Sequence, residues 1–136
     1  MAKVTKINHV AIAVSDLDGS LGFWRDAMGL DLTRVEDVPS QKSMVAFLPV
    51  GEGEVELVKP TAEDTGLAKF LETKGPGMHH LCLEVDDIEG MLADLKAKGV
   101  RLINETPEVL PGRKMAFVHP KSTGGVLVEL YEVTKG

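Results

Sequence analysis

An internal duplication is the feature that most constrains how this chain can fold. The segment Ile7–Asp18 recurs 71 positions later as the segment Met78–Glu89. Each copy continues through a helical stretch to a glycine, an Ala-Phe pair and a Val-Glu-Leu strand: Gly29, Ala46-Phe47 and Val55-Glu56-Leu57 in the first, and Gly99, Ala116-Phe117 and Val128-Glu129-Leu130 in the second. Two such copies predict two similar modules. Because one His and one Glu recur at matching places, we expect a single site assembled across a pseudo-twofold.

The apolar spacing predicts the element order βαβββ in each copy. Alternating β-branched and aliphatic residues predict strands, and apolar residues three or four apart that end at Gly29 and Gly99 predict helices. Ser15 with Asp18, and Asp86 with Glu89, resemble capping boxes at the two helix starts. The expected strands are residues 9–14, 32–35, 44–50 and 54–58 in the first copy and 80–85, 100–104, 114–119 and 126–133 in the second.

Length and hydrophobic content favour a single domain, and the predicted βαβββ order of each copy makes it α+β. A chain of 136 residues with 43% hydrophobic residues can bury one substantial core. We expect module one at about residues 5–60, a linker helix at about 62–75 and module two at about 78–134, within one domain spanning 1–136.

Charge and cysteine content argue against several classes of function. A net charge of −6 disfavours binding to nucleic acid or to an acidic membrane surface, because both need concentrated Lys and Arg. No window approaches about 18 continuous apolar residues, so neither a membrane span nor a secretory signal is expected. The single cysteine, Cys82, lies in an apolar run, where a buried, inert thiol is expected. These features predict a cytoplasmic protein.

Strand alternation decides which polar side chains can cooperate. His9 shares a face with the small residues Ala11 and Ala13, opposite a bulky apolar face suited to packing a helix. The same rule selects His80 over His79 in the second copy. The side chains that are thereby expected on the non-helical faces of four strands are His9, Glu56, His80 and Glu129.

Two imidazoles and two carboxylates suit a borderline divalent ion such as Co, Ni, Zn or Mn, and they do not suit an all-oxygen Ca site. A single His or Glu on a strand is more often a polar residue satisfied by the protein. Four together are harder to explain in that way, because unpaired carboxylates facing a sheet interior would each cost roughly several kcal/mol. The remaining histidine, His119, precedes Pro120 at a strand end and is expected to be structural.

The chain resembles the vicinal oxygen chelate superfamily and, within it, the methylmalonyl-CoA epimerase family. The resemblance extends over nearly all of the sequence. It rests on Asn8-His9-Val10-Ala11, Glu54-Val55-Glu56-Leu57, Ala68-Lys69-Phe70-Leu71, Gly77-Met78-His79-His80-Leu81, Lys98-Gly99-Val100, and His119-Pro120-Lys121-Ser122 with the strand that ends in Val128-Glu129-Leu130. The last segment is the most specific, since glyoxalase I, which has the same ligand types, typically carries Asp-Pro-Asp-Gly before its final Glu strand.

The resemblance implies paired βαβββ modules that form a cup-shaped mixed sheet around a divalent metal, with cobalt as the first choice and Mn, Ni or Zn as alternatives. It implies that His9, Glu56, His80 and Glu129 are the ligands. The implied reaction interconverts the (R) and (S) forms of methylmalonyl-CoA through an enolate by 1,1-proton transfer. Some relatives carry a second carboxylate where this chain has Val45, and many place Gln at position 56. We therefore expect Glu56 and Glu129 to be both ligands and the catalytic acid/base pair.

Other interpretations remain open from sequence. One is a glyoxalase I-like lactoylglutathione lyase or a metal-dependent dioxygenase. Iron extradiol dioxygenases use a His, His, Glu triad, so the four candidate ligands of this chain count against dioxygenase chemistry. Another is a non-catalytic small-molecule-binding member, although such members often lose the ligands. An acyl-CoA substrate is polyanionic, so Arg113 and Lys121, near Lys114, are candidate substrate-binding residues, with a solvated surface as the equal alternative. The resemblance also implies a homodimer.

Overall fold

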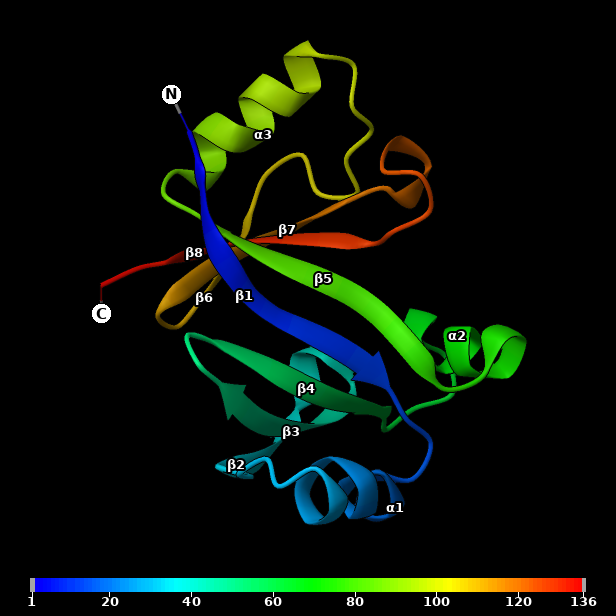
Figure 1. Ribbon diagram of the computed structural model, residues 1–136. Coiled ribbons are helices and arrows are strands. Elements are labelled where there is room, and N and C mark those ends of the chain that lie inside the picture. Colours follow the sequence, from blue (N-terminus) through cyan, green and yellow to red (C-terminus); the bar gives the residue numbers. More distant parts are fainter. Residues whose placement is uncertain (1, 136) are drawn as a thin grey trace. The chain divides into compact units, whose positions relative to one another are not determined.

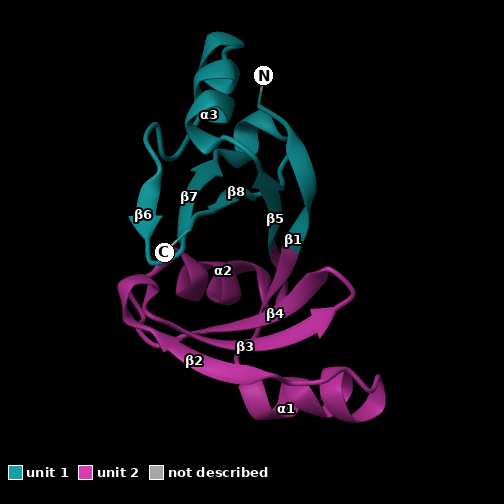
Figure 2. Cartoon of the chain, turned by 90° about the vertical axis from the view of Figure 1, so that its left-hand side faces the viewer, with its two compact units in different colours: residues 1–8, 80–136 teal, residues 9–79 magenta. Residues whose placement is uncertain are grey.

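The structure is a computed structural model that describes residues 2–135 and divides into two compact units. Unit 2 contains residues 9–79, and unit 1 contains the residues before His9 together with those from His80 onward (Figure 2). Two strands, β1 (Val4–Ala13) and β5 (Gly77–Val85), cross this division. Residues 4–8 of β1 therefore belong to unit 1, and residues 77–79 of β5 belong to unit 2.

Unit 2 contains a sheet in the order β2-β3-β4-β1. Its strands are β2 (Arg34–Val38), β3 (Ser43–Val50), β4 (Gly53–Pro60) and residues 9–13 of β1. β1 runs parallel to β4, and the other neighbours are antiparallel. Its helices are α1 (Leu17–Leu21), which continues into the π-helical segment η1 (Gly22–Ala27), the short 3-10 helix η2 (Pro39–Gln41) and α2 (Gly66–Lys74).

Helices cover both faces of the unit 2 sheet (Figure 2). Alternation sends the bulky residues of the strands to the α1 side, where Val14 and Leu57 pack with Leu21 in one cluster. The opposite face carries smaller residues such as Ala13, and Phe70 of α2 packs there in a second cluster. The small side chains of β1 thus provide the space that α2 fills.

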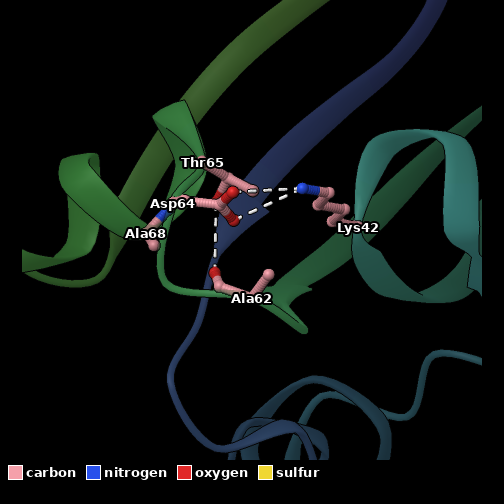
Figure 3. A network of polar contacts seen from close by, with 5 residues as sticks. All are labelled: Lys42, Ala62, Asp64, Thr65 and Ala68. Atoms are coloured by element: carbon pink, nitrogen blue, oxygen red, sulfur yellow. Dashed lines mark hydrogen bonds and ion pairs between the residues drawn. The ribbon is translucent and has the colours of Figure 1, made fainter.

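Polar contacts attach the start of α2 to the connection between β2 and β3 (Figure 3). The Thr65 hydroxyl caps the helix by accepting from the backbone N–H of Ala68 at 3.1 Å, and it donates to the Ala62 carbonyl at 3.4 Å. The Lys42 ammonium lies 3.1 and 3.4 Å from the two carboxylate oxygens of Asp64. These contacts support the position of α2 on its face of the sheet.

Unit 1 contains a sheet in the order β5-β8-β7-β6. Besides residues 80–85 of β5, its strands are β6 (Glu108–Leu110), β7 (Arg113–Val118) and β8 (Val128–Val133), with the 3-10 helix η3 (Pro120–Ser122) between β7 and β8. The N-terminal segment joins this unit, because the backbone N–H of Lys3 donates to the Asp86 carboxylate at 2.8 Å and the Asp86 N–H donates to the Lys3 carbonyl at 3.2 Å.

One helix, α3 (Ile88–Ala97), packs on the unit 1 sheet (Figure 1). Ile88 and Leu92 are buried against Val85, Val118 and Leu130, so this core contains the apolar strand residues that point to one face of the sheet. Gly99 follows the helix with a φ of 79°, a left-handed conformation that only glycine adopts easily. Within residues 2–135, no helix is long and apolar enough to cross a membrane.

The predicted strand at residues 100–104 is wrong. Only Leu102 pairs there, in an isolated bridge with Val118. The side-chain oxygen of Asn104 accepts from the backbone N–H of Phe117 at 2.8 Å, so a side chain replaces a backbone acceptor of the ladder. The edge strand of unit 1 is instead β6, which lies further along the chain.

Both predicted capping residues are wrong by one position. Asp16, and not Ser15, accepts from the backbone N–H of Gly19 at 3.1 Å. Asp87, and not Asp86, accepts from the N–H of Gly90 at 3.0 Å. Each predicted cap is followed directly by an aspartate, and Ser and Asp are both good N-caps, so spacing alone could not separate them.

Candidate metal and active site

In unit 2, β1 and β4 bring together His9 and Glu56. The parallel ladder places Ala11 opposite Glu56, and His9 lies on the same face two residues earlier. The His9 Nδ1 atom is 3.2 Å from a Glu56 carboxylate oxygen, and the two side chains are only 6% and 13% exposed. An imidazole and a carboxylate are therefore held together out of water.

Unit 1 repeats this arrangement with β5 and β8. Cys82 lies opposite Glu129 in the parallel ladder, and His80 precedes Cys82 by two residues on the same face. The His80 Nε2 atom is 3.0 Å from a Glu129 carboxylate oxygen, with side-chain exposures of 11% and 7%. Both copies of the duplication thus form one buried His-Glu pair each.

His79 takes no part in the His80-Glu129 pair. It belongs to unit 2, where its ring meets the Phe70 ring of α2 edge to face, with centroids 5.1 Å apart. The structure therefore pairs the histidine that alternation selects, His80, with Glu129. Whether His80 binds metal stays a prediction.

A phenylalanine lies beside the glutamate of each pair. Phe47 is the cross-strand partner of Glu56, and Phe117 is the cross-strand partner of Glu129. The Phe117 ring also meets the His80 ring edge to face, with centroids 5.6 Å apart. Each ring thus places apolar surface next to a carboxylate, and the Phe117 contact restricts how the His80 imidazole can rotate. The repeated Ala-Phe motif was the sequence signal for them, although it did not reveal their role.

One expectation about these faces is wrong. The face of unit 2 that carries His9 and Glu56 was predicted to be free of helices, but α2 covers part of it, near Ala13, Val45 and Val58. Alternation identifies the two sides of a strand, but it does not say which element covers each side. Val45, the position where some relatives carry a second carboxylate, is buried in this apolar cluster.

The four side chains fit a divalent metal by donor chemistry. Neutral imidazole nitrogens and carboxylate oxygens are the ligands that Co, Ni, Zn and Mn accept in proteins. In each pair, the imidazole nitrogen that contacts the carboxylate would have to turn toward the ion or be deprotonated to bind it. His9 in unit 2 and Glu129 in unit 1 are each 5% exposed, so each pair is shielded from bulk water within its own unit.

Two more residues of unit 1 share the His80 side of β5. Cys82 is fully buried, as expected. The Glu84 carboxylate accepts a hydrogen bond from the Asn8 side chain at 3.0 Å and lies 3.9 Å from the Lys6 ammonium. Glu84 is thus held by residues of β1, and the corresponding residue of the first copy is the small Ala13.

The candidate substrate-binding cations do not form one group. Arg113 begins β7 and is the partner of Leu110 in the β6-β7 hairpin, whereas Lys121 follows the other end of β7. Lys114 is 2.7 Å from Glu89 and holds the pKa of that carboxyl below its ordinary value by hydrogen bonding. Arg34, which the sequence did not single out, stacks its guanidinium 3.9 Å above the Phe47 ring and binds Glu36 at 2.8 Å.

Known proteins resemble this chain over most of its length. Residues 8–117 match the model of the Glyoxalase/Bleomycin resistance protein/Dioxygenase superfamily. The chain is 39% identical over 130 residues to the mitochondrial methylmalonyl-CoA epimerase of Mus musculus, covering 94% of this chain and 73% of that protein. It is 37% identical over 134 residues to the ethylmalonyl-CoA/methylmalonyl-CoA epimerase of Cereibacter sphaeroides, covering 96% and 99%.

Solved structures agree with these relatives. A variant of Streptomyces coelicolor methylmalonyl-CoA epimerase in complex with 2-nitronate-propionyl-CoA matches with a TM-score of 0.89 and 32% identity, over 97% of this chain and 96% of that one. The predicted fold class, that of the vicinal oxygen chelate superfamily, is thereby confirmed. The chain belongs to the methylmalonyl-CoA epimerase family of the Glyoxalase/Bleomycin resistance protein/Dioxygenase superfamily.

Proposed function

We propose that this protein is a methylmalonyl-CoA epimerase, which interconverts the (R) and (S) forms of the thioester by 1,1-proton transfer. The observation that carries the proposal is the pair of buried His-Glu contacts, at 3.2 Å in one unit and 3.0 Å in the other. Relatives named as epimerases at 37–39% identity favour this reaction over that of a lactoylglutathione lyase.

The proposed metal ligands are His9 and Glu56 from unit 2 and His80 and Glu129 from unit 1. Each unit supplies one imidazole and one carboxylate, so we propose that both modules act as one functional domain. When bound, a divalent ion would supply Lewis-acid stabilisation of the negative charge that develops on the thioester oxygen. Cobalt is the first choice, with Mn, Ni or Zn as alternatives.

Proton transfer is assigned to the two glutamates. One carboxylate accepts the α-proton of the substrate, and the electron pair of the C–H bond passes into a planar enolate. The other glutamate enters the cycle in its protonated form and gives its proton to the opposite face of that plane, which inverts the α-carbon. We propose Glu129 and Glu56 as this pair, because Val45 offers no carboxylate on β3.

Stereochemical inversion is the direct test. The protein, loaded with metal, is incubated with a single epimer of methylmalonyl-CoA in D₂O, and both the optical rotation and deuterium at the α-carbon are followed. We expect the single epimer to become a mixture of the (R) and (S) forms, with solvent deuterium at the α-carbon of the product. Turnover of the methylglyoxal-glutathione hemithioacetal, with no inversion of methylmalonyl-CoA, would identify a lyase instead. Tight binding of either compound without turnover would identify a non-catalytic member.

Three finer assignments accompany the proposal. A cytoplasmic location is proposed because the sequence has a single cysteine, so no disulfide within the chain can stabilise the fold. A homodimer is supported by the family resemblance. Arg113 and Lys121 are proposed to contact the acyl-CoA separately, because they lie at opposite ends of β7.

A further inference from the structure

The two copies differ in the hairpin that leads to the glutamate strand. In unit 2, Val50 pairs with Gly53, so only Gly51 and Glu52 connect β3 to β4. In unit 1, Val118 pairs with Val128, and the connection runs from His119 to Leu127. The tight hairpin carries an acidic residue at its turn, whereas the long loop carries His119 and Lys121.

Two hydrogen bonds of the Arg101 backbone bring this residue to the loop. The His119 N–H donates to the Arg101 carbonyl at 3.0 Å, and the Arg101 N–H donates to the Ser122 hydroxyl at 2.9 Å. The Lys121 N–H donates to Nδ1 of His119 at 3.1 Å. Arg101, His119, Lys121 and Ser122 therefore form one surface of unit 1, named here the Arg101 surface.

The charge of the Arg101 surface is not balanced locally. Partial burial lowers the pKa of His119 below its ordinary value, and the positive charges of Arg101 and Lys121 lower it further. Both cations therefore act on the same imidazole. Six other cations of the described residues form ion pairs with carboxylates, for example Lys42 with Asp64. Within the described part of the chain, neither Arg101 nor Lys121 forms an ion pair with a carboxylate.

We propose that the Arg101 surface binds the phosphate groups of the coenzyme A carrier, an inference that rests on the proposed function. Exposed cations suit phosphates, which keep part of their hydration, whereas the substrate carboxylate must lie near the buried reaction centre. The loop is close to that centre along the chain, since His119 follows Phe117, the partner of Glu129, by two residues, or about 7 Å of extended strand.

Substrates with and without the carrier phosphates test this proposal. The assay compares kcat/KM for methylmalonyl-CoA with kcat/KM for methylmalonyl-pantetheine, which has the same reacting atoms and no phosphate. In the double variant Arg101→Gln, Lys121→Gln, we expect the preference for the CoA ester to fall about tenfold or more. The substituted side chains are exposed, and the charge-preserving double variant Arg101→Lys, Lys121→Arg should restore most of the preference.

The matched control is the double variant Lys59→Gln, Lys69→Gln, which removes two exposed charges from β4 and α2 of unit 2 and should keep the preference of the parent. An unchanged preference in the Arg101, Lys121 double variant, or an equal loss in the control, would overturn the proposal.

Calorimetric titration with CoA and with pantetheine separates this proposal from the proposed function, because it needs no turnover. Loss of CoA affinity in the double variant alone would support the phosphate site even if the parent inverts no substrate. Equal affinity of the parent for CoA and pantetheine would refute the phosphate site even if the parent is an active epimerase.

Discussion

Separate replacement of the neighbouring histidines His79 and His80 by alanine tests the strand register on which the site depends. His80 and Glu129 are both about nine-tenths buried and lie 3.0 Å apart. His80→Ala leaves a buried carboxylate without one of its hydrogen-bond partners, which typically costs about 1–3 kcal/mol in the free energy of unfolding. It should also remove the stabilisation by metal, which for the parent is about 2.7 kcal/mol at a metal concentration of 100 times Kd.

His79→Ala should have a smaller effect of a different kind. Its edge-to-face contact with Phe70, at 5.1 Å between centroids, is worth about 0.5–1.5 kcal/mol. We therefore expect the metal-free variant to lose about 1 kcal/mol of unfolding free energy while its stabilisation by metal stays at the level of the parent. The variants His79→Ala and His80→Ala should therefore differ in metal binding as well as in the free energy of unfolding.

Thermal unfolding with and without metal, combined with elemental analysis after dialysis, measures both quantities. For a chain of this size, about 2.7 kcal/mol corresponds to a rise in Tm of about 10 °C. The parent and His79→Ala should show this rise, and His80→Ala should not. A rise that survives in His80→Ala and disappears in His79→Ala would show that the register is off by one residue. Loss of the metal-dependent rise in Tm in both variants would refute the argument from alternation.

Three further outcomes are expected. Glu56→Gln keeps an oxygen ligand but cannot carry the proton, so it should bind metal and lose at least about 100-fold in kcat; inversion near the parent rate would make Glu56 a ligand only. Asp87→Ala removes the cap of α3 and should lower the free energy of unfolding by about 1 kcal/mol in urea titrations, whereas Asp86→Asn should change it less, and equal losses would contradict the observed cap. Sedimentation should show a dimer at micromolar concentration, and a monomer there would refute the homodimer.

Alternation and duplication were sufficient to single out the four residues that form the two His-Glu pairs. A strand has a period of two residues, so the choice between His80 and His79 depends only on which neighbours are bulky. The repeat then identified Glu56 and Glu129 as partners at matching places, and the structure places each glutamate next to its histidine. Local patterns suffice here because the ladder fixes which side chains share a face.

Long-range pairing explains what could not be predicted. The pattern of residues 100–104 does not predict that the Asn104 side chain, and not a backbone carbonyl, accepts the hydrogen bond from the Phe117 N–H. Arg113 and Lys121 are close in sequence, yet β7 separates them, while Arg101 reaches the Lys121 loop through backbone hydrogen bonds. Sequence proximity was a poor guide to charge clustering because a strand extends by about 3.3 Å per residue.

The differences between the copies are consistent with one asymmetric substrate at a site built from a repeat. The His-Glu pair and its phenylalanine are kept in both copies, as the proposed metal site requires of each copy. Around the pair the copies diverge: Ala13 in the first corresponds to Glu84 in the second, and a two-residue turn corresponds to the loop that carries Lys121. An α-carbon that is inverted needs similar groups on its two faces, but a thioester carrier lies on one side only. Selection for inversion of the α-carbon would keep the two His-Glu pairs alike. Selection for binding of the carrier on one side would let the surrounding loops and faces differ, as they do here.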